Sequence, residues 1–160
     1  MIKMIRNFLY FLAASFLVLG TVSCSEKIDT GTDISGQWHL TDTGGLIEDQ
    51  NMAIDVYISF DSGNFSLYQK VGEDLLRYWY YDGTYSVSGD NVLTGRYTDG
   101  TRLGGARGLG YSVSSSGDEL TLTEVASGEV SVYRRAEIPS DVIDNAVPPV
   151  RSGDRPAPVL

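Results

Sequence analysis

Histidine and cysteine, which supply catalytic bases, nucleophiles and zinc ligands, are scarce in this 160-residue chain. His39 is the only histidine and Cys24 the only cysteine, and no Gly-x-Ser-x-Gly segment occurs. A nucleophile needs a neighbouring base, and zinc sites need several histidine or cysteine ligands. We therefore expect no metal site, no other cofactor and no hydrolytic triad, and we interpret the protein as not an enzyme.

Tyrosine is the abundant residue that could form a binding site, since the chain contains ten. Aromatic rings with polar ends line the cavities of amphipathic ligands, and they equally fill a barrel core when each hydroxyl finds a partner. Both alternatives stay open from the sequence. The tyrosines that we expect on an inner face, and thus in a ligand site, are Tyr78, Tyr80 and Tyr85, with Tyr97 and Tyr111 as further candidates.

Two arginines lie in a glycine-rich stretch from Asp99 to Gly108. The stretch lacks the Lys-Ser/Thr ending of a phosphate loop, so we interpret it as a flexible connection. The alternative is that Arg102 and Arg107 bind an anionic ligand at the mouth of a barrel. The chain itself carries a net charge of −9, which argues against nucleic acid as a partner.

The stretch Leu75–Val87 contains the strongest local turn signal, Asp82-Gly83 between two runs of strand-forming residues. This dipeptide is typical of a two-residue type I′ hairpin. Such a hairpin would pair Tyr80 with Tyr85. The predicted inner face contains Leu76, Tyr78, Tyr80, Tyr85 and Val87, while Trp79 and Tyr81 would face outward.

The chain between Ile34 and Arg135 alternates strands and turns without a helical repeat. The other predicted strands are Ile34–Leu40, Ile54–Phe60 and Phe65–Gln69 joined by a four-residue loop, Val92–Thr98, Leu109–Ser114, Glu119–Val125 and Glu129–Arg135. About eight or nine short strands in sequence predict an all-β, up-and-down antiparallel barrel, which is wide enough to be filled or to hold one small ligand. An open β-sandwich is the alternative, although it would need a long crossover connection.

The last segment, residues 136–160, changes in composition. Pro139 and Ser140 are typical of a helix start, and Pro148-Pro149 would end the helix. We expect its apolar side, with Val142, Ile143, Ala146 and Val147, to pack on the barrel. The proline-rich end from Val150 to Leu160 predicts a disordered tail.

Residues 1–23 have the organisation of an export signal, with a basic start and an apolar run that is too short to span a bilayer. Thr21-Val22-Ser23-Cys24 resembles the lipobox of bacterial lipoproteins, although leucine is usual where Thr21 stands. The resemblance implies cleavage before Cys24, acylation of this cysteine and membrane attachment through its acyl chains; a plain secretory signal is the alternative.

Cleavage would remove Lys3 and Arg6, leaving 10 basic against 21 acidic residues, a net charge of −11. Residues 24–33 would form a tether between anchor and domain. No aspartate follows Cys24, so we expect an outer membrane lipoprotein, on the periplasmic face or at the cell surface.

The domain at 34–135 is similar to the lipocalin-like lipoproteins of the Bacteroidetes. The similarity depends on Gly36-x-Trp38, on the stretch Asp82–Asp90 and on the closing Val132-Tyr133-Arg134-Arg135. It implies a barrel whose closed end is plugged by Trp38, with either Arg134 or Arg135 stacked on the indole.

The similarity implies no catalytic residues. We expect a protein that binds a small apolar or amphipathic molecule in the barrel, or an envelope protein. A cavity of at least about 300 Å³ lined by Tyr78, Tyr80 and Tyr85 would favour the small molecule. A filled interior would favour an interaction or inhibitor module that uses the loops 41–52 and 99–108.

Overall fold

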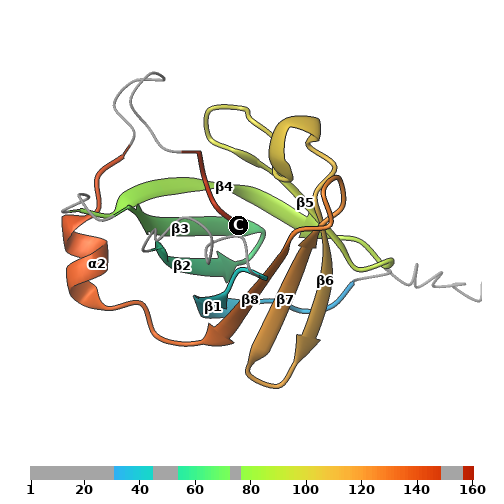
Figure 1. The fold of residues 1–160 in the computed structure, drawn as a ribbon, viewed down its shortest axis with the longest axis horizontal. Helices are drawn as coiled ribbons and strands as arrows, with labels where there is room; N and C mark the ends of the chain where they lie inside the picture. The colour runs from blue at the N-terminus through green and yellow to red at the C-terminus, as the bar shows by residue number, and fades with distance from the viewer. Residues whose placement is uncertain (1–30, 45–53, 73–76, 149–156) are drawn as a thin grey trace, which may run out of the picture.

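A computed structural model describes residues 31–44, 54–72, 77–148 and 157–160. Cys24, the predicted signal segment and most of the tether lie outside these ranges. Within them the chain forms a closed antiparallel barrel in which each strand pairs with its sequence neighbours and the last pairs with the first (Figure 1). The strands are β1 (Gly36–Asp42), β2 (Ile54–Asp61), β3 (Asn64–Val71), β4 (Trp79–Val87), β5 (Val92–Tyr97), β6 (Tyr111–Ser116), β7 (Glu119–Glu124) and β8 (Val130–Arg135). The predicted up-and-down barrel is therefore confirmed.

Side-chain alternation determines which face of each strand is buried. In β2, Val56, Ile58 and Phe60 are at most 1% exposed, whereas the residues between them are half-buried. All eight strands contribute inward side chains to one core cluster. Closure leaves the barrel without a free sheet edge, so the alternation can continue around the whole wall.

The β2–β3 hairpin is tighter than the sequence predicted. Asp61 lies opposite Asn64, so the loop has the two residues Ser62 and Gly63, with φ of 50° and 81°. Positive φ at both central positions is what a type I′ turn requires. The predicted hairpin is correct, but its predicted four-residue loop is wrong.

The predicted hairpin at Asp82-Gly83 is wrong, because both residues lie inside the continuous strand β4. Gly83 faces Phe65 on β3 and Tyr97 on β5. A Cβ at Gly83 would lie 2.0 Å from the carbonyl oxygen of Arg96 and 2.7 Å from the Phe65 ring. Glycine is thus needed for the close approach of neighbouring strands and not for a turn.

Because β4 is continuous, some of the residues that were predicted to face inward lie on the outer side of the barrel. In a straight strand the odd-numbered residues of β4 share one side, so Trp79, Tyr81, Tyr85 and Val87 contact the core. Tyr78 and Tyr80 lie on the outer side, where they pack with Tyr68. The inward placement of Tyr85 and Val87 is confirmed, and that of Tyr78 and Tyr80 is wrong.

Gly83→Ala is expected to lower the free energy of unfolding by about 1–3 kcal/mol, because the added methyl group forces two strands apart. Urea denaturation followed by circular dichroism measures this change. Thr84→Ala, on the exposed side of the same strand, should shift stability by less than about 0.5 kcal/mol. Equal stabilities of the two variants would contradict the close approach at Gly83.

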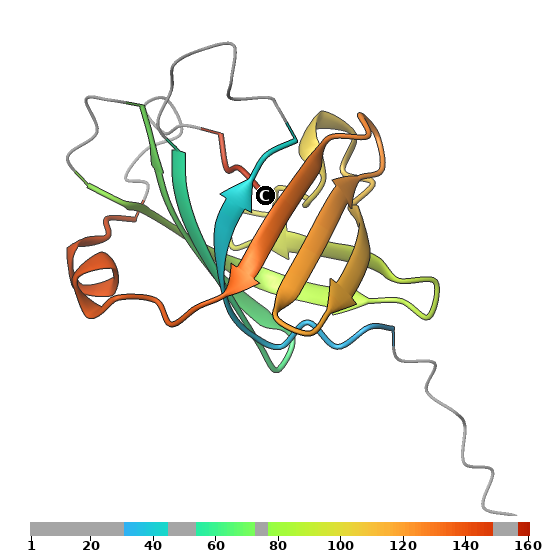
Figure 2. The ribbon, with the colours of Figure 1, turned by 60° about the horizontal axis from the view of Figure 1, so that its bottom comes forward.

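The closed end of the barrel is sealed by Trp38, which is 0% exposed. The Nε1 of Trp38 donates to the carbonyl oxygen of Ile34 at 2.9 Å, from the segment that crosses below the barrel (Figure 2). The guanidinium carbon of Arg135 lies 4.2 Å from the indole centroid, and its Nη1 donates to Ser35 at 3.2 Å. The predicted cation–π contact is therefore made by Arg135, since Arg134 instead lies 3.9 Å from Glu119.

Gly36 explains the spacing of the Gly-x-Trp segment. Its φ is +123°, and a Cβ there would lie 2.2 Å from Nη1 of Arg135. Glycine thus both adopts this backbone conformation and leaves room for the arginine over Trp38.

The helix α2 (Ser140–Asn145) covers the outer side of β2, β3 and β4 (Figure 1). Val142 is 3% exposed and packs with Tyr68 and Ile138, while Tyr78 and Tyr80 border this cluster. The expected packing of the helix on the barrel is confirmed. Ile143 differs from expectation, because its side chain is 45% exposed.

Candidate functional site

The open end of the barrel contains a cavity of about 380 Å³. It lies where β1 ends and β2 and β8 begin, opposite the end that Trp38 closes. Its lining combines apolar with polar and acidic side chains. The residues are Thr43, Ile54, Gly105, Tyr111, Glu124, Glu129, Ser131, Pro158, Val159 and Leu160.

The end of the chain forms part of this cavity. Leu160 is 8% exposed and belongs to the core cluster. The prediction of a disordered tail is thus wrong for residues 157–160, while 150–156 lie outside the described residues. Burial of Leu160 removes apolar surface from water, and polar side chains inside the barrel bind the backbone of these residues, which offsets the loss of chain entropy.

Tyr85, Tyr97 and Tyr111 lie on the inner face, as the sequence predicted. Of these three, only Tyr111 is among the lining residues of the open-end cavity. Tyr78 and Tyr80 cannot line it, because they lie outside the barrel. The predicted cavity lined by Tyr78, Tyr80 and Tyr85 is therefore wrong, because the cavity at the open end contains none of the three.

The sequence analysis missed two inner tyrosines, Tyr81 and Tyr133. Tyr133 is 0% exposed, and its hydroxyl has no hydrogen-bond partner among the described residues. Burial raises the pKa of Tyr133, and it likewise raises the pKa of Tyr97 and Tyr111. The alternation of β8 could have predicted that Tyr133 faces inward. Tyr133 is two residues from Arg135, so the two side chains share the face on which Arg135 contacts Trp38.

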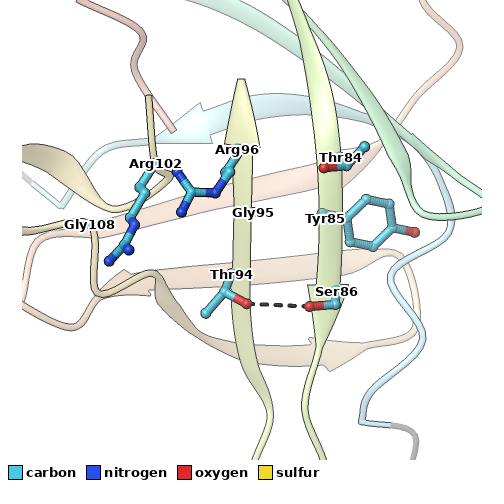
Figure 3. A pocket seen from close by; sticks show the side chains of 8 residues that line it. All are labelled: Thr84, Tyr85, Ser86, Thr94, Gly95, Arg96, Arg102 and Gly108. Atoms are coloured by element: carbon cyan, nitrogen blue, oxygen red, sulfur yellow. Dashed lines mark hydrogen bonds between the residues drawn. The ribbon is translucent and has the colours of Figure 1, made fainter. Parts of the chain in front are cut away.

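Arg102 lies on the outer wall, in a hollow of about 410 Å³ beside β4 and β5 (Figure 3). The loop returns along β5, with Arg102 opposite Arg96 and the amide of Leu103 donating to the carbonyl of Gly95 at 3.0 Å. Leu103 is 1% exposed and belongs to the core cluster. The structure therefore brings Arg102 together with Arg96 and not, as predicted, with Arg107.

The hollow is polar. Its other described lining residues are Thr84, Tyr85, Ser86, Thr94, Gly95 and Gly108, among which there is no carboxylate. The Tyr85 ring points away from the arginines in Figure 3. Arg107, at the end of the short 3₁₀ helix η1 (Gly105–Arg107), is not among the lining residues.

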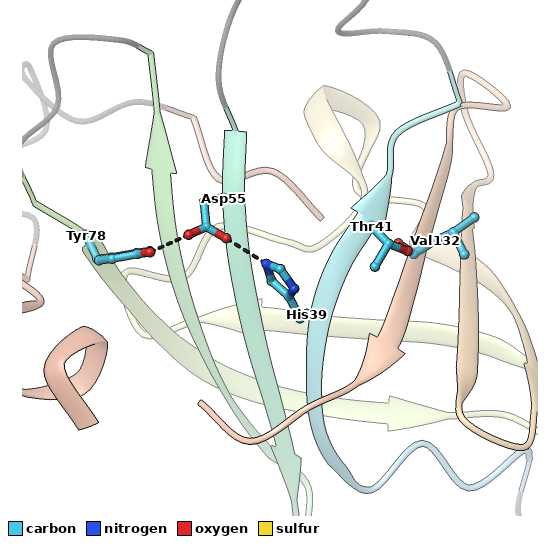
Figure 4. A network of polar contacts seen from close by, with 5 residues as sticks. All are labelled: His39, Thr41, Asp55, Tyr78 and Val132. Carbon is cyan, nitrogen blue, oxygen red and sulfur yellow. Dashed lines mark hydrogen bonds and ion pairs between the residues drawn. The ribbon is translucent and has the colours of Figure 1, made fainter. Parts of the chain in front are cut away.

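A polar network on the outside of the barrel joins β1 and β2 to the residue before β4 (Figure 4). The Nε2 of His39 lies 2.7 Å from Oδ1 of Asp55, and the hydroxyl of Tyr78 donates to Oδ2 of the same carboxylate. His39 also stacks on Tyr57 at a centroid distance of 4.3 Å. Burial and the bond to Asp55 raise the pKa of Tyr78. His39 thus faces away from Trp38, and the network ties β1 and β2 to Tyr78, the residue before β4.

Among the described residues, no three side chains of His, Cys, Asp or Glu form a group that could hold a metal ion. No helix in the described part of the chain is long and apolar enough to cross a membrane.

No family model matches the chain, and comparison with curated proteins and with solved structures returned no match.

Proposed function

We propose that the protein is a non-catalytic, lipid-anchored envelope protein of the lipocalin-like type that binds a small amphipathic molecule at the open end of its barrel. The observation that carries this proposal is the cavity of about 380 Å³. Its size falls in the range of about 300–1,000 Å³ that is typical of small-molecule sites. Its apolar side chains would bury the tail of the ligand and its polar ones would bind the head group.

The charge of the lining favours one class of head group. Glu124 and Glu129 are the carboxylate side chains among the described lining residues, which contain no lysine or arginine. An anionic head group would be repelled by the two glutamates, whereas a cationic or hydroxyl-rich one would be attracted. We therefore propose a cationic or neutral amphiphile as the ligand.

A calorimetric titration of the folded domain with two amphiphiles of equal alkyl chain length tests this proposal. Dodecyltrimethylammonium, below its micellar concentration, should bind at least about tenfold more tightly than dodecyl sulfate, a difference of about 1.4 kcal/mol. Glu129→Gln should reduce the difference, and Glu137→Gln, an exposed charge outside the cavity, should not. Equal binding of both probes, or binding of neither, would refute the ligand class.

The proposed lipid anchor is supported by the segment before Cys24 and by the absence of a second cysteine. More than one acyl chain gives stable attachment. Mass spectrometry of the protein from its native membrane should find Cys24 as the acylated N-terminal residue. A cleaved but unmodified cysteine would favour a plain secretory signal.

A second candidate function, an interaction module that uses the loops, is favoured by the hollow at Arg96 and Arg102. Two arginines with three hydroxyl-bearing neighbours can bind a carboxylate, sulfate or phosphate group. The partner would then be an anionic group on an envelope protein or glycan.

Titration with inorganic phosphate, followed by amide chemical shifts, should move Thr94 and Gly95 in a saturable way. Arg102→Ala is expected to weaken this binding by about tenfold, since a charge-assisted hydrogen bond contributes about 1.5–3 kcal/mol when shielded and less when exposed. Arg107→Ala is the matched control, because it removes an equal charge from the same loop outside the hollow. Equal effects of the two variants would mean that phosphate binding depends only on the net charge of the protein, which would contradict a site in the hollow.

A further inference from the structure

Residues 157–160 are bound to the inside of the barrel by polar side chains. The Nε2 of Gln69 donates to the carbonyl oxygen of Ala157 at 3.0 Å, and the amide of Val159 donates to Oε1 of Gln69 at 2.8 Å. The hydroxyl of Ser131 donates to the main-chain oxygen of Leu160 at 3.0 Å. Three backbone groups of a four-residue segment are thus bound by two side chains.

Gln69 is the unusual member of this set, because it is 0% exposed on the inner face of β3. A buried amide side chain is costly unless both its donor and its acceptor are satisfied. In an extended strand, the carbonyl of one residue and the amide of the residue two positions later point to the same side. The carboxamide of Gln69 therefore binds the segment as the peptide group of a neighbouring strand would.

The sequence of the segment fits this arrangement. Pro158 lies between the two residues that Gln69 binds, and its backbone faces the other way, so its missing N–H costs no bond to Gln69. Leu160 adds an apolar anchor that is 8% exposed within the core cluster. The contacts thus favour a peptide with an extended backbone. Its second residue needs no N–H, and its fourth residue is apolar, as Leu160 is.

We infer that the open end of the barrel is a binding site for an extended apolar peptide, and that Ala157–Leu160 is the peptide that occupies it in this structure. The cavity of about 380 Å³ is lined by Pro158, Val159 and Leu160. It is therefore the space that remains beside the bound segment, and departure of the segment enlarges it. Any other occupant of this end competes with the segment for Gln69 and Ser131.

The experiment uses a chain that lacks residues 157–160 and the synthetic peptide acetyl-Ala-Pro-Val-Leu-amide. Addition of the peptide should shift the side-chain amide resonances of Gln69 and the backbone amide of Ser131 in a saturable way. N-methylation of the valine removes the donor to Oε1 of Gln69 and should weaken binding by about tenfold. N-methylalanine in place of proline is the matched control, since neither residue has an N–H, and it should retain most of the affinity.

Failure of the peptide to bind, or equal binding of the peptide with N-methylated valine, would overturn the inference. Should the shortened chain not fold, the full-length variant Gln69→Met provides the same test. Its Val159 and Leu160 should show the heteronuclear NOE values of a free chain end, whereas rigid values would overturn the inference. The titration contains no amphiphile, so its failure is distinct from failure of the proposed small-molecule function.

Discussion

Replacement of Trp38 by alanine is expected to lower the free energy of unfolding by about 3–5 kcal/mol, the usual cost of deleting a large aromatic side chain from a core. The indole is 0% exposed, and its N–H is bonded to the carbonyl of Ile34. Its loss would leave this carbonyl unpaired and the guanidinium of Arg135 without its aromatic platform. Urea denaturation followed by circular dichroism measures the change.

The adjacent arginines of β8 provide the matched controls. Arg135→Ala should cost about 0.5–2 kcal/mol, because it removes the cation–π contact. Arg134→Ala should change stability by less than about 0.5 kcal/mol, since its ion pair with Glu119 is exposed. A loss below about 1 kcal/mol for Trp38→Ala, or equal effects of the two arginine variants, would contradict the structure of the closed end.

Alkaline pH is expected to destabilise the barrel through its buried tyrosines. Burial raises the pKa of Tyr97, Tyr111 and Tyr133 in the folded state above their ordinary value. A raised pKa means that the neutral form is favoured in the folded state, so this contribution is present below about pH 10 and is lost as the pH rises toward the folded-state pKa. Above pH 10 the unfolded state binds fewer protons, and unfolding is favoured.

Each such tyrosine should reduce the free energy of unfolding by up to about 1.4 kcal/mol for each pH unit above 10. Denaturation at a series of pH values from 8 to about 11.5 measures the slope. Tyr133→Phe should reduce the pH dependence of the free energy of unfolding by the contribution of one tyrosine. At neutral pH this variant should not lose stability, because the hydroxyl of Tyr133 has no partner among the described residues. A free energy of unfolding that does not change above pH 10 would contradict this account, because it would show that these tyrosines ionise as readily in the folded as in the unfolded state.

The barrel could be predicted because its signal is local and repeated. Alternation such as Val56, Ile58 and Phe60 specifies a half-buried strand wherever it occurs, and short turns between such strands leave few topologies. The contact of Trp38 with an arginine of the last strand was instead implied by the resemblance to lipocalin-like lipoproteins. The choice between Arg134 and Arg135 required the strand register, because only Arg135 lies directly opposite Trp38 and therefore on the same face of the sheet.

The error at Asp82-Gly83 shows where local signals fail. The dipeptide favours a turn, but close packing of Gly83 against the Arg96 backbone and Phe65 determines the structure. The wrong turn also reversed the predicted faces of Tyr78 and Tyr80, because a two-residue hairpin places even residues before it on the same face as odd residues after it, whereas a continuous strand does not. Positive φ was instead required at Ser62-Gly63, where the sequence had suggested a longer loop.

The open end could not be predicted from any segment alone. The sequence places Gln69 on a strand without indicating a role for it, and the proline content of the last segment predicts disorder at Ala157–Leu160. Their contact joins residues 88 and 90 positions apart in sequence. The hollow at Arg96 and Arg102 depends in the same way on the return of the loop along β5, which a glycine-rich composition does not reveal.

Native mass spectrometry of the protein purified from its own membrane tests the central claim, a ligand site at the open end of the barrel, most directly. We predict a species that carries one non-covalent small molecule per chain, of cationic or neutral amphiphilic character, in addition to the acyl mass on Cys24. Protein that is recovered only without a bound molecule, and that also fails to take up dodecyltrimethylammonium, would contradict the claim.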